Sequence, residues 1–490
     1  MASDITAEQD YSPASVQAYD PTLPPKLLTT VHCPSSPSFP GNFFRSAHWC
    51  PDGSSLLTLS EDHVLRLYPF APEADYSLSH LPLSPPLAFP SPAPVTSHLW
   101  HPFATPSSPA YSFLLAARGQ PIHLLSASTG ARLASYRIID HREQFISPLS
   151  LAFEPSSLGT RFWAGHSSAL ESFDLSRPGP GTRFPLAGTR KSRSGQRGLI
   201  SALAFSPTDA DTLACGSYSN TVALYSLSDP REAQAMLSVP GGVTQLTWSP
   251  EGGKLMAGFR GKAQGEVWVW DVRMFAEGRH WTLRAPPPPS SSAAAAHPHS
   301  GTGTGTQQRL LHSLSPSGRY LLLPTPSGYV HTFDLSLSLS QPSNPYPDPA
   351  DPADPAEPEP VGGWQAHGDA VGSVQFFPAE GWGLGVTVGG GRHYPDDEEE
   401  MPGGEESLGE EGDATGLGGE HAAEEDSSED SEDSSEASDS HSKSSSTSRS
   451  IQILPTPKRP YAQVVRQSRP RPRDSTLKLW KFPEVAAGSG

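Results

Sequence analysis

Short stretches in which hydrophobic and polar residues alternate recur along most of the chain, and helical periodicity does not. Residues 199–205 (LISALAF) and 243–248 (VTQLTW) show the two-residue period of a β-strand. Each stretch ends in a bulky apolar residue, one further residue and a proline, which stops strand pairing. This unit occurs seven times, 43 to 66 residues apart, with its prolines at Pro51, Pro102, Pro155, Pro207, Pro250, Pro316 and Pro378.

Two more strand-like stretches follow each proline. The first mixes small and apolar residues, as in 212–216 (TLACG), and the second ends in an aromatic residue or Leu, as in 267–271 (VWVWD). Three short strands repeated seven times are typical of β-propeller blades, with a fourth, outer strand in the connecting stretches. The alternative is a β-sandwich with coincidental prolines, which seven registered copies disfavour. We predict an all-β, seven-bladed WD-repeat β-propeller, closed by an outer strand at Lys26 to His32.

The seventh unit is interrupted, because its matching last strand, 476–482 (TLKLWKF), lies roughly 100 residues after Pro378. The acidic, serine-rich run and the basic run between them cannot bury enough apolar surface to offset the entropy of ordering. We therefore predict a long disordered acidic insertion in the last blade. The expected organisation is a disordered tail (1–25), propeller blades 1–7 (26–391), a disordered acidic then basic insertion (392–473), the last propeller strand (474–484) and a tail (485–490).

The net charge of −18 comes from that insertion. Between Asp396 and Ser440 there are 20 acidic residues and no Lys or Arg, so the rest of the chain is nearly neutral and its total charge does not decide for or against nucleic acid. The acidic run is either a solvating segment or a kinase substrate whose phosphoserines bind basic partners. The basic run from Lys443 to Arg473 is a nuclear import signal, a nonspecific RNA contact or a counterweight to the acidic run.

Other composition signals exclude several protein classes. Cys33, Cys50 and Cys215 are too few for a disulfide framework and indicate a reducing compartment. The chain shows no secretory signal and no apolar run near the ~18 residues of a membrane span, so we expect a soluble, intracellular monomer without membrane contact. P-loop, HExxH and CxxC patterns are missing, and no GxGxxG opens a helix after a strand. We therefore predict no catalytic residues, no metal and no cofactor.

Basic residues gather in segments that the strand pattern places in loops at blade edges. Ordinary surface charge accounts for any one of them, whereas several basic loops on one scaffold can together bind phosphates, with aromatic or His neighbours stacking on bases. The RNA-binding candidates are Arg118, Arg137, His141 and Arg142 around blades two and three, Lys191, Arg193 and Arg197 (with Arg190) before blade four, and Arg260 and Lys262 in blade five.

With its repeats aligned, the sequence resembles the telomerase Cajal body protein family from about Asn42 to Trp480. The resemblance rests on residues 42–68 (NFFRSAHWCPDGSSLLTLSEDHVLRLY), 121–137 (PIHLLSASTGARLASYR), 198–225 (GLISALAFSPTDADTLACGSYSNTVALY) and 241–273 (GGVTQLTWSPEGGKLMAGFRGKAQGEVWVWDVR). Family members also carry an acidic insertion late in the last blade. Asn42, Phe43, Arg260 and the stretch 216–218 (GSY) match family positions, and we assign Phe43 to blade packing.

The resemblance implies a non-catalytic scaffold that binds small nuclear RNA through a loop element of box H/ACA small Cajal body RNAs and of telomerase RNA. It implies ribonucleoprotein and telomerase proteins as partners, a role in ribonucleoprotein localisation and telomerase trafficking, and residence in the nucleus, in Cajal bodies. The alternative is a protein-only WD-repeat adaptor for assembly of a nuclear complex. An enzyme is the third reading and would need a composite site built from several blades.

Overall fold

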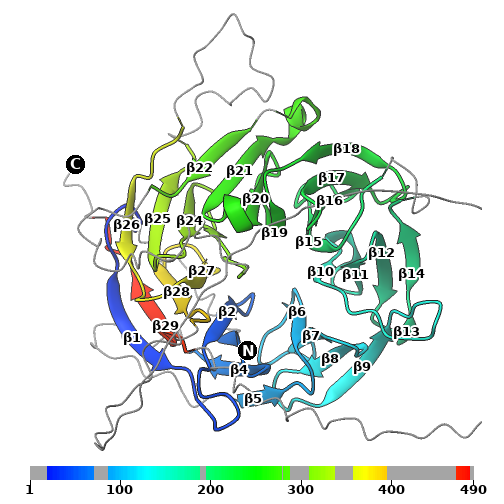
Figure 1. Cartoon of the computed structure of the whole chain (residues 1–490), viewed down its shortest axis with the longest axis horizontal. Helices are drawn as coiled ribbons and strands as arrows, with labels where there is room; N and C mark the ends of the chain where they lie inside the picture. The colour runs from blue at the N-terminus through cyan, green and yellow to red at the C-terminus, as the bar shows by residue number, and fades with distance from the viewer. Residues whose placement is uncertain are drawn as a thin grey trace, which may run out of the picture. The chain divides into compact units, whose positions relative to one another are not determined.

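The computed structural model describes residues 19–70, 87–187, 195–278, 280–286, 308–336, 357–393 and 471–485. In these ranges the chain forms seven sheets arranged as a closed ring (Figure 1). Helical structure in the same ranges is confined to three 3-10 segments, η1 (Pro155–Ser157), η2 (Gly261–Ala263) and η3 (Val272–Glu277). The predicted seven-bladed β-propeller is confirmed.

Blades 1 to 4 each run from an innermost strand to an outer one in chain order. Blade 1 contains β2 (Phe44–Trp49), β3 (Ser55–Ser60), β4 (Val64–Pro69) and β5 (Leu87–Pro90). Blade 2 contains β6 (Val95–Trp100), β7 (Ser112–Ala117), β8 (Ile122–Ser126) and β9 (Arg132–Arg137), extended by the short parallel strand β13 (Gly179–Pro180). Blade 3 contains β10 (Ser150–Phe153), β11 (Arg161–His166), β12 (Ala169–Asp174) and β14 (Thr182–Pro185). Blade 4 contains β15 (Ile200–Phe205), β16 (Thr212–Ser217), β17 (Thr221–Ser226) and β18 (Ala233–Ser238).

Blades 5 and 6 repeat this order, and blade 7 combines both ends of the chain. Blade 5 contains β19 (Gly242–Trp248), β20 (Lys254–Arg260), β21 (Glu266–Asp271) and β22 (Trp281–Arg284). Blade 6 contains β23 (Ser313–Leu314), β24 (Tyr320–Pro324), β25 (Tyr329–Asp334) and β26 (Gly362–Gln365). Blade 7 contains β27 (Val371–Phe376), β28 (Leu384–Gly389), β29 (Thr476–Lys481) and β1 (Lys26–His32).

The ring is closed by β1, which pairs antiparallel with β29 as the sequence predicts. The first strand of the chain is thus the outer strand of the last blade, so unfolding of blade 7 opens the ring. The other neighbour of β29 is β28, with Val386 opposite Leu479, so residues 390–475 are an insertion between two paired strands. Arg392, His393 and 471–473 at its ends are described, and the predicted disorder of the remainder falls outside the described residues.

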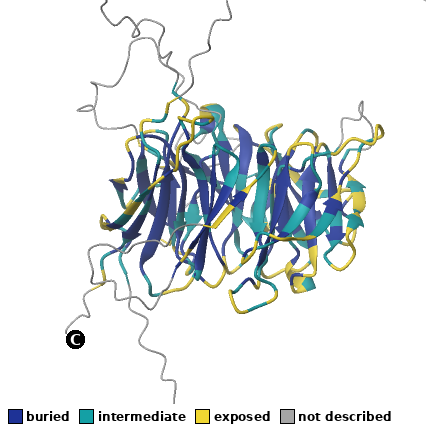
Figure 2. Ribbon diagram, turned by 90° about the horizontal axis from the view of Figure 1, so that it is seen from below, coloured by how far each residue is buried: buried dark blue, intermediate teal, exposed yellow. Residues whose placement is uncertain are grey.

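The hydrophobic core lies between blades rather than within them. Each cluster of buried side chains joins two neighbours: one links blades 7 and 1 through Leu28, Phe44 and Val386, and another links blades 4 and 5 through Val222, Val243 and Trp270. Buried positions fill the inner strands, whereas loops at both rims and the outer strands carry most of the exposed positions (Figure 2). A single blade therefore has too little core of its own, and the ring stabilises its parts together.

The recurring proline begins the turn after each innermost strand. In blade 1 the Cys50 carbonyl accepts a 2.8 Å hydrogen bond from the nitrogen of Gly53, whose φ is +74°. A Cβ there would lie 2.2 Å from the Phe377 ring of blade 7, so glycine serves both the turn and the approach of the next blade. The three cysteines are buried and free. Within the described ranges, no helix has the length and apolar content to cross a membrane.

Candidate nucleic-acid interface

The described basic candidates all lie on one rim of the ring. This rim, called the basic rim below, holds the turns between second and third strands and the connections from each outer strand to the next blade, opposite the rim with the seven prolines. Arg118 and Lys262 lie in second-to-third-strand turns, and Arg197 lies in the connection between blades 3 and 4. Arg190, Lys191 and Arg193 belong to that same connection but fall outside the described residues. Arg137, His141 and Arg142 lie at the start of the connection between blades 2 and 3, and Arg260 ends β20.

Most of these candidates have exposed side chains: Arg118, Arg137, His141, Arg142, Arg197 and Lys262. The loop of Arg142 is ordered by Asp140, whose carboxylate accepts hydrogen bonds from the backbone nitrogens of Arg142 and Gln144 (2.8 and 2.9 Å). The structure thus presents the predicted cations to solvent on one rim. Among the described candidates, no hydrogen bond or ring contact joins one to another.

Arg260 differs, because it belongs to a cluster at the centre of the basic rim. Its guanidinium lies 3.6 Å from the centroid of the Tyr218 ring, in cation–π contact. The Tyr218 hydroxyl accepts a 2.8 Å hydrogen bond from Nε of Arg309. The cluster, called the mouth cluster below, consists of Arg45, Glu61, Tyr218, Arg260, Arg309 and Arg392. The sequence analysis identified Arg260 and the 216–218 stretch and missed the other members.

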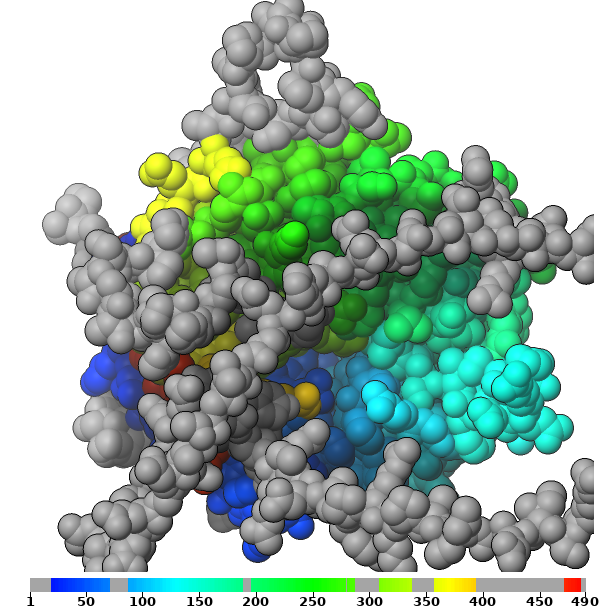
Figure 3. Space-filling model, in the orientation of Figure 1, coloured from blue at the N-terminus to red at the C-terminus, as the bar shows by residue number. Residues whose placement is uncertain are grey.

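Residues 308 and 309 connect opposite sides of the ring. Arg309 reaches Tyr218 of blade 4 and donates to the Leu149 carbonyl before blade 3 (3.4 Å). Gln308 donates from its side-chain nitrogen to the Gly390 carbonyl of blade 7 (3.0 Å). Since blades 3 and 4 lie across the ring from blade 7, these contacts place the mouth cluster over the central axis. In the space-filling view the centre of the ring is recessed below the surrounding loops (Figure 3).

The remaining members come from blades 1 and 7. Arg45 lies on the innermost strand β2 and pairs with Glu61 of the β3–β4 turn at 3.7 Å. Arg392, just after β28, also pairs with Glu61. Within the described residues, the ion pairs of Arg45 and Arg392 are both with Glu61, and no ion pair of Arg260 or Arg309 is seen. Among its described members, the mouth cluster therefore holds four cations and one carboxylate, which pairs with two of them.

This imbalance is visible in neighbouring ionisable groups. Burial lowers the pKa of Arg45, and the charges of Arg392 and Arg309 lower it further, against the opposing effect of Glu61. Burial, His48, Arg45 and Arg309 together hold the pKa of His98 well below its usual value. His98 contacts His48 below the arginines, with ring centroids 4.9 Å apart, and both are neutral at neutral pH. Among the described residues, the mouth cluster therefore carries more cations than carboxylates, an arrangement that favours anions.

The ends of the blade 7 insertion are fixed on the same rim. Asp369 accepts hydrogen bonds from Nε2 of His393 (2.8 Å) and from the backbone nitrogen of Arg473 (2.9 Å). The Arg471 nitrogen donates to the His393 carbonyl (2.7 Å). The acidic and basic runs thus leave and rejoin the propeller beside Arg392.

The family-matching residues of blade 1 have structural contacts. Buried Asn42 donates to the Pro34 carbonyl (2.6 Å) and accepts from the Asp62 nitrogen (3.0 Å), which orders the turn that carries Glu61. Phe43 is 3% exposed, and its ring would lie 2.3 Å from a Cβ at Gly390. Asn42 and Phe43 therefore support the mouth cluster from below.

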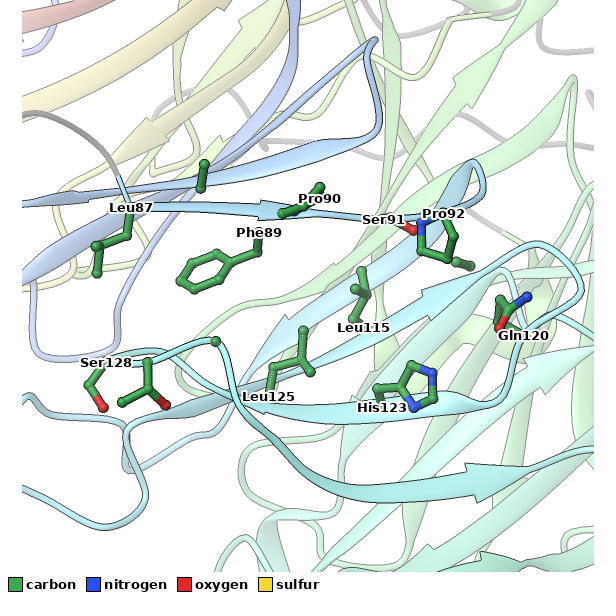
Figure 4. Close-up of a pocket in the computed structure, with 14 residues that line it drawn as sticks. Leu87, Phe89, Pro90, Ser91, Pro92, Leu115, Gln120, His123, Leu125 and Ser128 are labelled. Atoms are coloured by element: carbon green, nitrogen blue, oxygen red, sulfur yellow. The ribbon is translucent and has the colours of Figure 1, made fainter.

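A second concave feature lies at the side of the ring between blades 1 and 2. It is a cavity of about 350 Å³ between β5 and the second and third strands of blade 2 (Figure 4). Its walls are mostly apolar, with Phe89, Leu115 and Leu125 facing one another across it, and His123 bonded to Ser135 (2.9 Å). Among the described residues, no group of three or more His, Cys, Asp or Glu is placed to hold a metal ion.

Comparison with known proteins finds relatives of this chain. A mouse protein named telomerase Cajal body protein 1 (Mus musculus) is 31% identical over 309 residues, 62% of this chain and 53% of the relative. The rat protein of that name (Rattus norvegicus) is 32% identical over 306 residues, 61% of this chain and 52% of the relative. A Schizosaccharomyces pombe protein named guanine nucleotide-binding protein negative regulator 1 is 33% identical over 252 residues, 49% of this chain and 61% of the relative.

These matches confirm the family resemblance drawn from the repeats. The chain spans about half the length of its mammalian relatives. No family model matches the sequence.

Proposed function

Since this chain is a relative of the telomerase Cajal body proteins, we propose that it is a non-catalytic scaffold that binds small nuclear RNA at the mouth cluster. The RNA is of the box H/ACA small Cajal body type, telomerase RNA included. Its further role is to assist ribonucleoprotein localisation and telomerase trafficking, with ribonucleoprotein and telomerase proteins as partners. The proposed place of action is the nucleus, in Cajal bodies.

One observation carries this proposal: Arg260 and Arg309 contact Tyr218 over the central axis, and Arg45 and Arg392 share the carboxylate of Glu61 on the same rim. Arginine pairs with phosphate through two parallel hydrogen bonds, and unpaired bases stack on aromatic rings and guanidinium planes. The other described candidates lie on the same rim. They supply a diffuse positive field that guides RNA toward the mouth.

Crosslinking followed by sequencing of bound RNA, with the full chain expressed in cells, tests the proposal. Enrichment of box H/ACA RNAs with crosslinks at Tyr218 or the basic rim supports it. The double variant Arg45→Gln/Arg309→Gln, checked for an intact fold by circular dichroism, is expected to lose that enrichment. If the wild-type chain recovers only proteins, or the variant retains the RNA, the proposed function fails.

The second candidate function is a protein-only adaptor. Two observations favour it: the name of the S. pombe relative, which concerns a protein target, and the apolar cavity between blades 1 and 2. Recovery of proteins without RNA in the crosslinking experiment would favour this candidate. Loss of those proteins on substitution of Phe89, with the mouth variant unaffected, would assign binding to the cavity.

A further inference from the structure

Glu61 holds an unusual position among the cations of the basic rim. Its carboxylate is the shared partner of Arg45, at 3.7 Å, and of Arg392. The Glu61 side chain is 17% exposed, whereas those of Arg45 and Arg392 are 37% and 55% exposed, so the carboxylate lies beneath cations that face solvent. The Glu61 nitrogen donates to the Phe43 carbonyl (3.0 Å), which fixes the backbone of the turn.

The two arginines come from segments far apart in the sequence, β2 and the start of the blade 7 insertion. Another arginine, Arg309, also lies near Arg45, and its charge lowers the pKa of Arg45. A carboxylate and a phosphodiester present oxygens to guanidinium groups in similar geometry, so a place that holds one anion suits the other. Two charges on the arginines also exceed the one charge of Glu61.

We infer that the Glu61 carboxylate occupies a phosphate-binding site, and that a backbone phosphate of the RNA displaces it to bind Arg45 and Arg392. This inference rests on the proposed function for the identity of the ligand, but the site itself would accept any exposed phosphate group. Glu61 then competes with RNA: it keeps the two arginines paired in the free protein and weakens the binding of any RNA that cannot displace it. The opposite role, a carboxylate that only positions the arginines for RNA, predicts the opposite change on substitution.

The first test compares Glu61→Gln with wild type in binding a short fluorescein-labelled RNA. Because the variant leaves two guanidinium groups unpaired, we expect affinity to rise, on the order of two- to tenfold. The decline of affinity with salt should also become steeper, since RNA then releases more condensed counterions. The matched control is Glu251→Gln, which removes a carboxylate paired with Lys254 (3.4 Å) on the proline-bearing rim. An equal gain in both variants would show a mere change of net charge and overturn the inference, as would weaker binding by Glu61→Gln.

The second test needs no RNA and separates this inference from the proposed function. Inorganic pyrophosphate is added to wild type, Glu61→Gln and Glu61→Gln/Arg45→Gln while the thermal unfolding midpoint is recorded. Pyrophosphate should raise the midpoint most in Glu61→Gln and least in the double variant, because ligands that bind only the folded state stabilise it. If pyrophosphate binds but the protein has no affinity for RNA, the inferred phosphate site stands and the proposed RNA function fails. If pyrophosphate shifts the midpoint equally in all three proteins, the inferred phosphate site is wrong.

Discussion

The indole nitrogen of Trp480 donates a 2.8 Å hydrogen bond to the hydroxyl of Thr387, which precedes it by 93 residues. The same hydroxyl lies 2.8 Å from Nε2 of His367, and Nδ1 of His367 lies 3.1 Å from the Asp474 carboxylate. The chain of contacts joins three strands or loops of blade 7 on both sides of the long insertion. It explains how the blade keeps its register although β28 and β29 are separated by residues 390–475.

Substitution of Trp480 by Phe should destabilise the ring by more than its loss of volume explains. The variant leaves the buried Thr387–His367 pair without its donor, an added cost of about 1–2 kcal/mol. Trp281→Phe is the matched control, because that indole is similarly buried and its nitrogen has no hydrogen-bond partner among the described residues. Guanidinium denaturation of both variants measures the difference. Equal losses of unfolding free energy would mean that the network contributes nothing.

The blade architecture was predictable because each blade follows from a short, local sequence pattern. Each innermost strand ends at a proline, as at Trp248-Ser249-Pro250, and each blade repeats the same three strands. Even the ring-closing strand at Lys26–His32 follows from its alternation and from the missing outer strand of blade 7. Local pattern suffices for blades 1 to 6 because, β13 aside, each of them is built from consecutive strands of the chain.

The mouth cluster and the Trp480 network were not predictable in this way. Trp270 is followed by Asp271, but among the described residues its indole nitrogen has no hydrogen-bond partner. The hydrogen-bonded network instead involves Trp480, which is followed by Lys481. Arg309 borders a low-complexity segment and reads as a linker residue. Its contact with Tyr218 depends on the closure of the whole ring, which no local signal reports.

Arg309→Gln should weaken RNA binding more than Lys262→Gln. Arg309 lies at the axis and is bonded to Tyr218, so its guanidinium is already held in place, whereas Lys262 is an exposed cation in the turn after Arg260. We expect a loss on the order of tenfold for Arg309→Gln and about twofold for Lys262→Gln. Fluorescence anisotropy with a labelled RNA at fixed salt measures both. Equal losses would place binding on the diffuse rim rather than at the mouth.

Gly216→Ala should destabilise the contact between blades 4 and 5. A Cβ at Gly216, in the middle of β16, would lie 2.4 Å from Cγ1 of Val243 and 2.8 Å from its Cβ. Overpacking of this kind costs about 1–3 kcal/mol. Gly368→Ala is the control, because a Cβ there meets nothing within 4 Å. Urea denaturation should show a lower unfolding midpoint for Gly216→Ala and an unchanged midpoint for Gly368→Ala. Similar midpoints in the two variants would mean that blades 4 and 5 accommodate the added methyl group without cost.

Leu28→Ala tests whether the N-terminal strand closes the ring. Leu28 is 5% exposed and belongs to the core shared by blades 7 and 1, whereas the adjacent Leu27 is 42% exposed. Removal of the buried side chain should cost about 2–5 kcal/mol, and Leu27→Ala, the matched control, less than about 0.5 kcal/mol. Thermal unfolding of both proteins provides the comparison. A small effect at Leu28 would show that the ring holds without its closing strand.

Acidification should unfold the propeller through its buried histidines. Burial lowers the pKa of His48, His166, His312 and His331 from 6.5 to about 4 in the folded protein. Between those two values the unfolded chain binds more protons than the folded one, so the free energy of unfolding falls as pH drops from about 6.5 toward 4 and is level above that window.

Each titrating histidine adds about 1.4 kcal/mol per pH unit to the slope. Denaturation at pH 7, 6 and 5 (points chosen to span about that interval) measures the slope. His312→Gln should reduce it by roughly one proton, with His141→Gln at an exposed position as the matched substitution. A slope unchanged by His312→Gln would show that this imidazole takes up its proton without unfolding the ring.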